Sequence, residues 1–323
     1  MSTVLVTGGT GFVGSHLIEV LLRSGDRVRA LVRSPAKAQA LGFDGVEWVA
    51  GDLNDPPALH LATRDVGVIY HVAGLVAVQN EAVGMAVNRD GTARLLEAAS
   101  DTGARFVLVS SLAAAGPSVP GHPLNGTEPP APVTAYGRSK LAAETVVRQG
   151  FLPWVILRPP AVYGPRDREM LRVFSGIIRL GLAPVFGQGN QQLSLIYGPD
   201  LAEAIATAGK SAGTPGQIYC PAHPEVVTTT ELVRGIADAA GRNVRVLRIP
   251  VPLGRVMLNL TGSIAGLTGR ATVLNRDKGN EFFAPAWTCD PAPLERSTGW
   301  QARHDLRSGA AATLDWYRKA GWL

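Results

Sequence analysis

The sequence has few of the residues that mark secreted or metal-binding proteins. Its two cysteines, Cys220 and Cys289, are too few and too widely spaced for a disulfide framework or a zinc pattern. Its six histidines show no metal-ligand spacing either. We therefore expect reduced thiols, a cytoplasmic protein and no bound metal.

Long hydrophobic runs are also lacking. The longest uncharged stretch near the C-terminus, Val256 to Gly269, has 14 residues and includes Asn, Thr and Gly. A membrane-spanning helix needs about 20 mostly apolar residues. The segment Met1 to Thr7 has neither the basic start nor the apolar centre of a signal peptide, and it predicts a strand. We expect no membrane span.

Runs of like charge are short. The net charge is +5, but no more than two basic residues stand in a row, so a nucleic-acid partner is not expected. Hydrophobic residues make up 46% of the chain and charged residues 18%, which is the composition of a globular protein. A small-molecule substrate is the expected partner.

The first 165 residues alternate short apolar runs with helical patterns. Apolar runs without polar alternation are typical of parallel strands that are covered on both faces. The pattern predicts an α/β fold with a doubly wound parallel sheet, the Rossmann architecture. The expected strands are 4–6, 28–32, 46–49, 66–71, 106–109 and 154–157, and the main helices are 12–24, 85–100 and 135–149.

After Gly164 and Pro165 this rhythm breaks, and Pro, Gly and irregular apolar stretches become frequent. We place a Rossmann domain at residues 1–165 and a smaller, mainly substrate-binding C-terminal cap at 166–323. Strand and helix patterns predict a return to the first domain near 191–220, so the two parts are interleaved. Further helices are expected at 230–240 and 252–267.

A glycine-rich loop lies directly between the first strand and the first helix. Gly9, Gly11 and Gly14 match G-x-G-x-x-G, and Gly8, Gly11 and Gly14 match a wider spacing. Glycine permits the tight turn and the close approach of the backbone to a pyrophosphate. The N–H groups at the helix start attract the anion. The predicted dinucleotide contacts are Gly8, Thr10, Gly11, Phe12, Val13 and Gly14.

The end of the second strand carries no carboxylate. A site that prefers NAD usually has Asp or Glu there, to bond the ribose hydroxyls, whereas this chain has Arg33 and Ser34. The guanidinium of Arg33 would bind a 2′-phosphate, with Ser34 or Lys37 as additional donors. The sequence therefore favours NADP(H) over NAD(H).

Tyr136 and Lys140 stand at positions i and i+4 of a predicted helix and project from one face. A nearby ammonium is expected to lower the pKa of a phenol, so that Tyr136 can exchange a proton with a carbonyl or alcohol oxygen. Ser110 and Ser111 end a strand at the sheet edge where ligands bind. Either hydroxyl could orient the substrate oxygen.

These motifs, together with Arg158 to Pro165, Ser297 to Trp300 and Asp315 to Tyr317, resemble the extended short-chain dehydrogenase/reductase family over nearly the whole chain. The resemblance implies a catalytic triad of Ser111, Tyr136 and Lys140, in which Lys140 also holds the nicotinamide ribose. It also implies a homodimer. The further cofactor contacts that it implies are Asp52, Leu53, Ala73, Asn88, Pro159 and Val162.

The subgroup is indicated by Ser110 to Pro117, which is most similar to the 3β-hydroxysteroid dehydrogenase and dihydroflavonol reductase branches. The cap offers an apolar lining that suits an apolar substrate, in the stretches Val251 to Leu253, Val256 to Leu258 and Ile264 to Leu267. A phosphorylated ligand stays a possibility because the sequence also has three arginines in this part, Arg166, Arg168 and Arg172.

We expect an NADP(H)-dependent oxidoreductase that transfers hydride to or from a ketone or secondary alcohol of a largely apolar small molecule. Two alternatives stay open. One is an NDP-sugar epimerase or dehydratase that retains its NAD(P), and the other is a non-catalytic NADP-binding protein. The sequence does not fix the substrate, its stereochemistry or the direction of reaction.

Overall fold

The computed structural model describes residues 3–78, 80–258 and 276–323. Its largest sheet is built from β1 (Thr3–Thr7), β2 (Arg27–Val32), β3 (Val46–Ala50), β4 (Val66–His71), β5 (Arg105–Val109), β6 (Trp154–Leu157) and β10 (Gln217–Tyr219). The strand order is β10-β6-β5-β4-β1-β2-β3, and every neighbouring pair is parallel. The order reverses between β1 and β4, where open α/β sheets bind ligands. The predicted doubly wound fold is confirmed.

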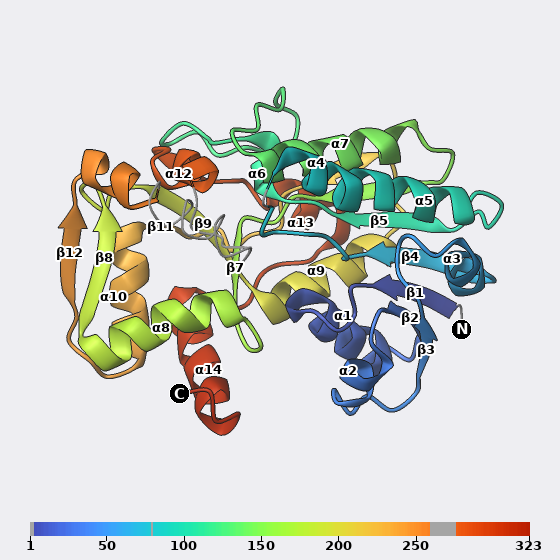
Figure 1. The fold of residues 1–323 in the computed structure, drawn as a ribbon, viewed down its shortest axis with the longest axis horizontal. Helices are drawn as coiled ribbons and strands as arrows, with labels where there is room; N and C mark the ends of the chain where they lie inside the picture. Colours follow the sequence, from blue (N-terminus) through green and yellow to red (C-terminus); the bar gives the residue numbers. More distant parts are fainter. Residues whose placement is uncertain (1–2, 79, 259–275) are drawn as a thin grey trace.

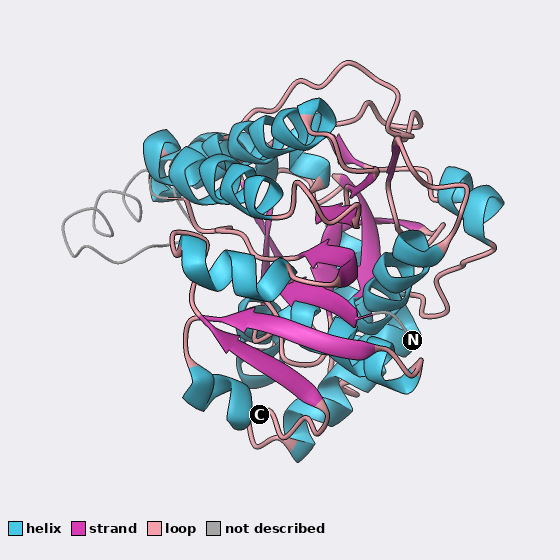
Figure 2. Cartoon of the chain, turned by 90° about the vertical axis from the view of Figure 1, so that its right-hand side faces the viewer, coloured by secondary structure: helices cyan, strands magenta, loops and turns pink. Residues whose placement is uncertain are grey.

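Helices cover both faces of this sheet (Figure 2). They are α1 (Phe12–Arg23), α2 (Pro35–Gln39), α3 (Pro56–Thr63), α4 (Glu81–Gly84), the π-helix η1 (Met85–Asp90), α5 (Gly91–Ala98), α6 (Leu112–Ala115), α7 (Ala135–Gln149) and α9 (Gly198–Lys210). Val4 and Val6 are buried with residues of α1 and α9, while Leu5 is buried with residues of α3, α5 and α7. Consecutive residues of β1 therefore serve two different cores.

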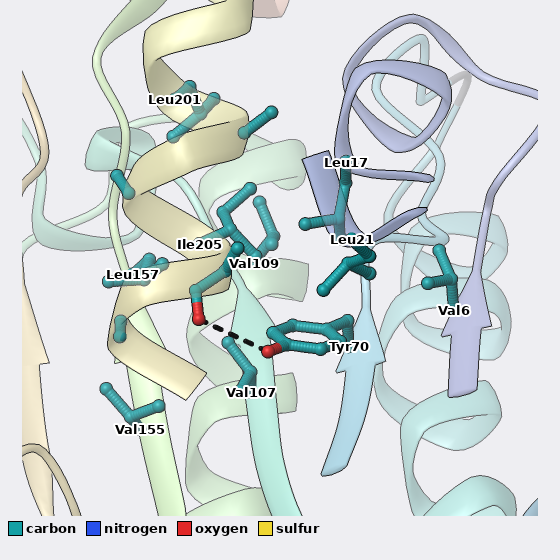
Figure 3. Packing of buried hydrophobic residues seen from close by; sticks show 14 of the residues in the cluster. Val6, Leu17, Leu21, Tyr70, Val107, Val109, Val155, Leu157, Leu201 and Ile205 are labelled. Carbon is teal, nitrogen blue, oxygen red and sulfur yellow. Dashed lines mark hydrogen bonds between the residues drawn. The ribbon is translucent and has the colours of Figure 1, made fainter. Parts of the chain in front are cut away.

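A buried tyrosine forms a polar link between the sheet and α9. Tyr70 of β4 is fully buried and donates a hydrogen bond to the carbonyl oxygen of Ala206 at 3.2 Å (Figure 3). Leu17, Leu21 and Ile205 lie around it in the same cluster. A buried phenol without a partner would be costly, so this bond helps to hold α9 against the sheet.

Most of the C-terminal part lies at the opposite end of the molecule from the N-terminus (Figure 1), although Leu294 and Trp300 are buried in the core beside α9. Its elements are β7 (Ala161–Tyr163), α8 (Arg168–Leu180), β8 (Leu182–Phe186), β9 (Gln192–Tyr197), β11 (Val226–Thr228), α10 (Thr229–Ala239), β12 (Arg245–Ile249), α12 (Arg276–Phe282), β13 (Ala286–Trp287), α13 (Ala292–Thr298) and α14 (Leu306–Lys319). Residues 251–258 are also helical. β9 pairs with β7, β11 and β13, and β8 pairs with β12. A third core joins α8, α10 and α14.

The predicted elements differ from the structure in two informative places. The helix expected over residues 85–100 contains the π-helix η1 at its start. The return to the first domain that the sequence predicts near 191–220 begins with β9, but this strand lies in the second sheet, so only α9 and β10 join the large sheet there. The apolar pattern of one strand cannot show which sheet the strand joins, because the choice of sheet depends on partner strands far away in the sequence. The cap helix expected at 252–267 lies partly outside the described residues.

Candidate functional site

The glycine-rich loop follows β1 and leads into α1. Gly8 has a φ of +73°, and a Cβ atom there would come within 2.7 Å of the backbone nitrogen of Ala73. A Cβ on Gly14 would lie 2.2 Å from the carbonyl oxygen of Gly8. Both positions therefore require glycine. Gly11 caps α1 without a side-chain hydrogen bond, and no acidic residue occupies the first turn of the helix. Its N–H groups can thus bind an anion.

Buried polar side chains hold the ends of β1 and β4 together. The hydroxyl of Thr7 lies 2.7 Å from Nδ1 of His71 and accepts a hydrogen bond from the backbone N–H of Ala73 at 3.3 Å. Nε2 of His71 lies 2.9 Å from the hydroxyl of Thr92. Burial lowers the pKa of His71 to about 3, so the ring stays neutral. It acts as a structural link below the predicted cofactor loop.

Tyr136, Lys140 and Ser111 come together at the carboxyl end of β5. α7 begins at Ala135 because Thr134 caps it, accepting a hydrogen bond from the N–H of Gly137 at 3.1 Å. The phenol of Tyr136 is hydrogen-bonded to the hydroxyl of Ser111. The ammonium of Lys140 is buried and donates to the carbonyl oxygen of Val109 at 2.7 Å. The predicted triad thus forms one cluster.

The expected effect of Lys140 on Tyr136 is wrong for the structure as it stands. Burial is the main cause that raises the pKa of the Tyr136 phenol to about 12; the bond from Ser111 opposes this rise, and the carboxylate of Glu281 contributes to it. Burial also lowers the pKa of Lys140 to about 8. At neutral pH Tyr136 is therefore a neutral phenol, which can donate a proton.

Ser110 and Ser111, which the sequence left equivalent, have different surroundings. Ser110 is buried and donates a hydrogen bond to Glu144. Glu144 also binds Arg158 through two bonds, of 3.0 and 2.6 Å, and both side chains are almost fully buried. Ser111 is half-buried, caps α6 and contacts Tyr136. Ser110 belongs to an internal ion-pair cluster, whereas Ser111 faces the phenol.

Asn88 joins this cluster from the π-helix η1. Its amide exchanges two hydrogen bonds with the backbone of Leu75, at 2.8 and 3.1 Å, and donates a third to the hydroxyl of Ser139 at 2.8 Å. A Cβ on Gly74 would lie 3.2 Å from Oδ1 of Asn88 and 3.4 Å from Nζ of Lys140. Asn88 therefore positions the loop after β4 beside α7, and π-helical turns are frequent at such sites.

The predicted adenosine-side residues lie at the same sheet edge. Arg33 follows β2, is exposed and forms no ion pair among the described residues. Ser34 caps α2 and accepts a hydrogen bond from the N–H of Lys37, whose side chain is exposed. Asp52 accepts a hydrogen bond from the N–H of Asn54 at 2.7 Å. Leu53 packs against Gly91. The residues that the resemblance places on the nicotinamide side are Pro159, whose carbonyl accepts a hydrogen bond from the N–H of Leu112, and Val162, which lies in β7.

Sequence reasoning missed the residues of α12 that bind the start of α7. Asp277 accepts a hydrogen bond from the N–H of Ala135 at 2.7 Å, and Glu281 accepts one from the hydroxyl of Thr134 at 2.9 Å. The ammonium of Lys278 lies 5.9 Å from the centre of the Tyr136 ring and pairs with Glu281. No local motif predicts these contacts, because they join segments about 140 residues apart.

The three arginines considered for a phosphorylated ligand are engaged elsewhere. Arg166 binds Glu19 on α1, and the guanidinium of Arg168 lies 4.6 Å from the ring centre of Trp322. Arg172 pairs with Glu169 one turn away. None of the three is placed beside Tyr136 by these contacts, so they give no support to a phosphate site there. Among the described residues, no group of His, Cys, Asp and Glu side chains could hold a metal ion.

The fold and the site define a dinucleotide-binding protein. The turn that only glycine permits, the uncapped start of α1 and the buried Lys140 beside Gly74 fit a nicotinamide dinucleotide lying across the β1–β4 edge. Residues 4–220 match the NAD dependent epimerase/dehydratase family. The chain belongs to this family of oxidoreductases, as the motifs predicted.

Several known proteins are similar to the whole chain or to most of it. A ceramide reductase of Caulobacter vibrioides is 34% identical, over 99% of this chain and 96% of that protein. The 3 beta-hydroxysteroid dehydrogenase/Delta 5-->4-isomerase of Mycobacterium tuberculosis is 30% identical, over 79% of this chain and 74% of that protein. The structure of UDP-glucose 4-epimerase of Thermus thermophilus with NAD has a TM-score of 0.79 at 27% identity, covering 98% and 99% of the two chains.

A bilayer-spanning helix must be both long and apolar. None of the described helices combines the two properties to the extent that crossing a membrane requires.

Proposed function

We propose that the protein is an NADP(H)-dependent reductase of a ketone on a long, largely apolar molecule. The observation that carries the proposal is the neutral Tyr136 phenol, bonded to Ser111 and next to the buried Lys140. A binding protein has no need of such a proton relay. A phenol that keeps its proton at neutral pH suits the donation of a proton to the oxygen of a ketone that is being reduced.

The choice of NADP(H) is supported by Arg33. It is exposed at the end of β2, next to the loop after β1, since Thr7 and Leu31 are paired in the sheet. An exposed guanidinium without an ion pair among the described residues can bind a 2′-phosphate in a forked geometry. No carboxylate at this strand end competes for the ribose. The family description names NAD, so the preference for the phosphorylated form is a property that we propose for this chain.

Several residues of the chain have distinct roles in the proposed reaction. A nicotinamide cofactor, when bound, would supply the hydride. Ser111 and Tyr136 hold the substrate oxygen between two hydroxyls, and Tyr136 donates its proton to that oxygen. The ammonium of Lys140, anchored to the carbonyl of Val109, stabilises the negative charge left on the phenol. Asn88 and Ser139 keep the loop after β4 in contact with α7.

The substrate class is supported by similarity to known proteins. The similar proteins include one named for ceramide and others named for steroids, and both are apolar molecules. A direct test is to follow NADPH oxidation with ketone derivatives of ceramide, with 3-ketosteroids and with a water-soluble aryl ketone. Activity with the lipid ketones is expected. If no member of the panel is reduced although NADPH binds, the reductase proposal is wrong.

The alternative of an NDP-sugar epimerase or dehydratase has its own test. Some similar proteins carry this activity in their names, such as a UDP-glucose 4-epimerase of Vibrio cholerae that is 26% identical. An epimerase re-reduces its cofactor within each cycle. Purified protein that retains NAD and converts UDP-glucose without added NADPH would favour this alternative over the reductase.

Replacing Arg33 tests the cofactor choice. For Arg33→Ala we expect the KM for NADPH to rise by about tenfold or more, because a charge-assisted contact worth about 1.5–3 kcal/mol is lost. The KM for NADH should change little. Arg148→Gln, an exposed arginine at the far end of α7, serves as the control. Equal effects on NADPH and NADH would contradict a role for Arg33 at the 2′-phosphate.

The pH profile tests the role of Lys140. Its pKa of about 8 means that the ammonium is present below this pH and is lost above it, while Tyr136 stays protonated up to its own pKa of about 12. We expect kcat/KM for ketone reduction to be flat near neutrality and to fall above a pH of about 8. Lys140→Arg, which cannot lose its charge, should move this fall beyond the measured range. A wild-type profile that stays flat far above the pKa of Lys140 would show that its charge is not required.

A further inference from the structure

One face of the C-terminal part is not used by the proposed reaction. In β8, Ala183 and Val185 are buried toward α8 and α10, while Leu182 and Pro184 alternate with them and are exposed. Leu247 of β12 is paired with Pro184 and therefore lies on the same side. Leu182 and Leu247 are 37% and 38% exposed. The outer side of this two-stranded sheet is thus apolar and open.

The helix over residues 251–258 lies on this same side. Phe186 alternates in phase with Leu182 and Pro184, so its ring points outward from the sheet. A Cβ on Gly254 would lie 2.6 Å from the Phe186 ring. The helix therefore covers the carboxyl end of the outer side, and Figure 1 shows it at the tips of β8 and β12. We call the outer side of β8 and β12 together with this helix the cap face.

The helix turns a second apolar stripe outward. Gly254 and Leu258 are buried, whereas Leu253, Val256 and Met257 are 53%, 53% and 45% exposed. These three side chains are spaced i, i+3 and i+4, which places them on one side of the helix. From the sequence we expect them to line a substrate pocket. In the structure this stripe is at the surface, because the small Gly254 is the residue that lets the helix pack on Phe186.

The cap face is also positively charged. Residues 239–258 include four arginines and no acidic residue, so this segment carries most of the net charge of +5. Arg242, Arg245 and Arg248 are exposed, and none of them forms an ion pair within the described ranges. Arg245 is paired with Leu182 and lies on the outer side of the sheet, whereas Arg248 is paired with Val185 and lies on the other side. The fourth, Arg255, lies 5.3 Å from the ring centre of Phe283. The acidic residues that flank the segment are Asp238, at the end of α10, and Asp277, which binds the N–H of Ala135.

We propose that the cap face docks on the surface of an anionic lipid bilayer. Apolar side chains that enter the interface, surrounded by arginines that meet phosphate groups, form a peripheral membrane site. The face is connected to the reaction site through α12. The ring centre of Phe186 lies 5.3 Å from that of Phe283, the residue that directly follows α12. At its other residues, Asp277 and Glu281, α12 binds the start of α7. The inference rests on the proposed function, since a long apolar substrate resides in membranes.

The test is sedimentation with sucrose-loaded vesicles, using the full chain without cofactor or substrate. Binding is expected to phosphatidylcholine vesicles that contain phosphatidylglycerol, to be much weaker without it, and to fall as salt is raised. Leu253→Glu and Val256→Glu should each reduce binding by about tenfold or more, since each places a charge where an apolar side chain enters the interface. Arg245→Gln and Arg255→Gln should each reduce it about fivefold.

Matched controls keep folding and function separate from docking. Phe151→Glu, at a residue that is 98% exposed after α7, and Arg148→Gln make the same chemical changes away from the cap face and should leave vesicle binding unchanged. All variants should keep the native melting temperature and the native turnover of a water-soluble ketone. If the native protein does not turn over the ketone at all, only the proposed function is refuted. The docking proposal is not affected, because vesicle binding needs no reaction.

Two outcomes would overturn the docking proposal. One is native protein that fails to bind anionic vesicles, or cap-face variants that bind as well as native protein. The other is a concentration-dependent dimer that Leu253→Glu dissociates, with no vesicle binding, which would make the cap face an interface between two copies of the chain.

Discussion

Replacing Tyr136 with Phe is expected to reduce the turnover of the ketone by about 10²- to 10⁴-fold, the usual contribution of a positioned general acid. The change removes only the hydroxyl that bonds to Ser111 and donates the proton. The ring, which lies 5.9 Å from the ammonium of Lys278, is retained. The measurement is steady-state oxidation of NADPH with the best substrate of the panel.

Binding data separate this effect from a loss of structure. The Tyr136→Phe protein should bind NADPH with nearly native affinity and melt close to the native temperature, because the hydroxyl has no part in the loop at Gly8 to Gly14. Ser111→Ala, which leaves the phenol in place, should lower turnover less. Turnover of Tyr136→Phe within about tenfold of the native value would mean that another group donates the proton.

Replacing Glu144 with Ala is expected to lower the free energy of unfolding by about 3–5 kcal/mol. Glu144 accepts two hydrogen bonds from Arg158 and one from Ser110, and all three side chains are buried. Without Glu144 the guanidinium stays buried and loses the carboxylate with which it is paired. The remaining nitrogen of Arg158, Nη1, already has no hydrogen-bond partner among the described residues, so the cluster holds no spare acceptor. Urea denaturation measures the change.

An exposed ion pair provides the control for this experiment. Arg138 and Glu81 form a bond of 2.9 Å, but their side chains are 39% and 48% exposed. Glu81→Ala should therefore change the free energy of unfolding by at most about 1 kcal/mol. The double replacement Glu144→Leu with Arg158→Met should recover part of the loss, because no unpaired charge is left inside. A loss below about 1 kcal/mol for Glu144→Ala would contradict a structural role for the cluster.

The large sheet was predictable because its signals are local. Apolar runs predicted β4 at Val66–His71 and β6 at Trp154–Leu157 with their observed bounds, and α7 at Ala135–Gln149 likewise. The glycine loop was predictable for the same reason, since its turn depends on adjacent residues. Tyr136 and Lys140 were predicted to share a helix face, and the helix repeat places them in one cluster with Ser111.

The surroundings of the same residues were not predictable. Whether Ser110 or Ser111 faces the phenol depends on Glu144 and Arg158, which lie on other elements. Glu144 accepts the hydrogen bond of the Ser110 hydroxyl and is itself paired with Arg158. The pKa of Tyr136 depends on how far its surroundings, α12 among them, remove the phenol from water, so the expected lowering by Lys140 was wrong. Desolvation is a property of the packed site, and the sequence distance between groups does not report it.

The two cysteines, whose scarcity was the first notable feature of the sequence, show the same difference between what the sequence predicts and what only the tertiary structure decides. Composition alone argued against a disulfide framework. Yet Cys220 and Cys289, far apart along the chain, are buried in one small core and in contact through their thiols. The sequence by itself determined the Rossmann sheet, the glycine loop and the Tyr136 helix, because each follows from neighbouring residues. Only the tertiary structure decided what surrounds Tyr136 and which apolar side chains of the cap stay exposed, because burial arises from contacts between distant segments.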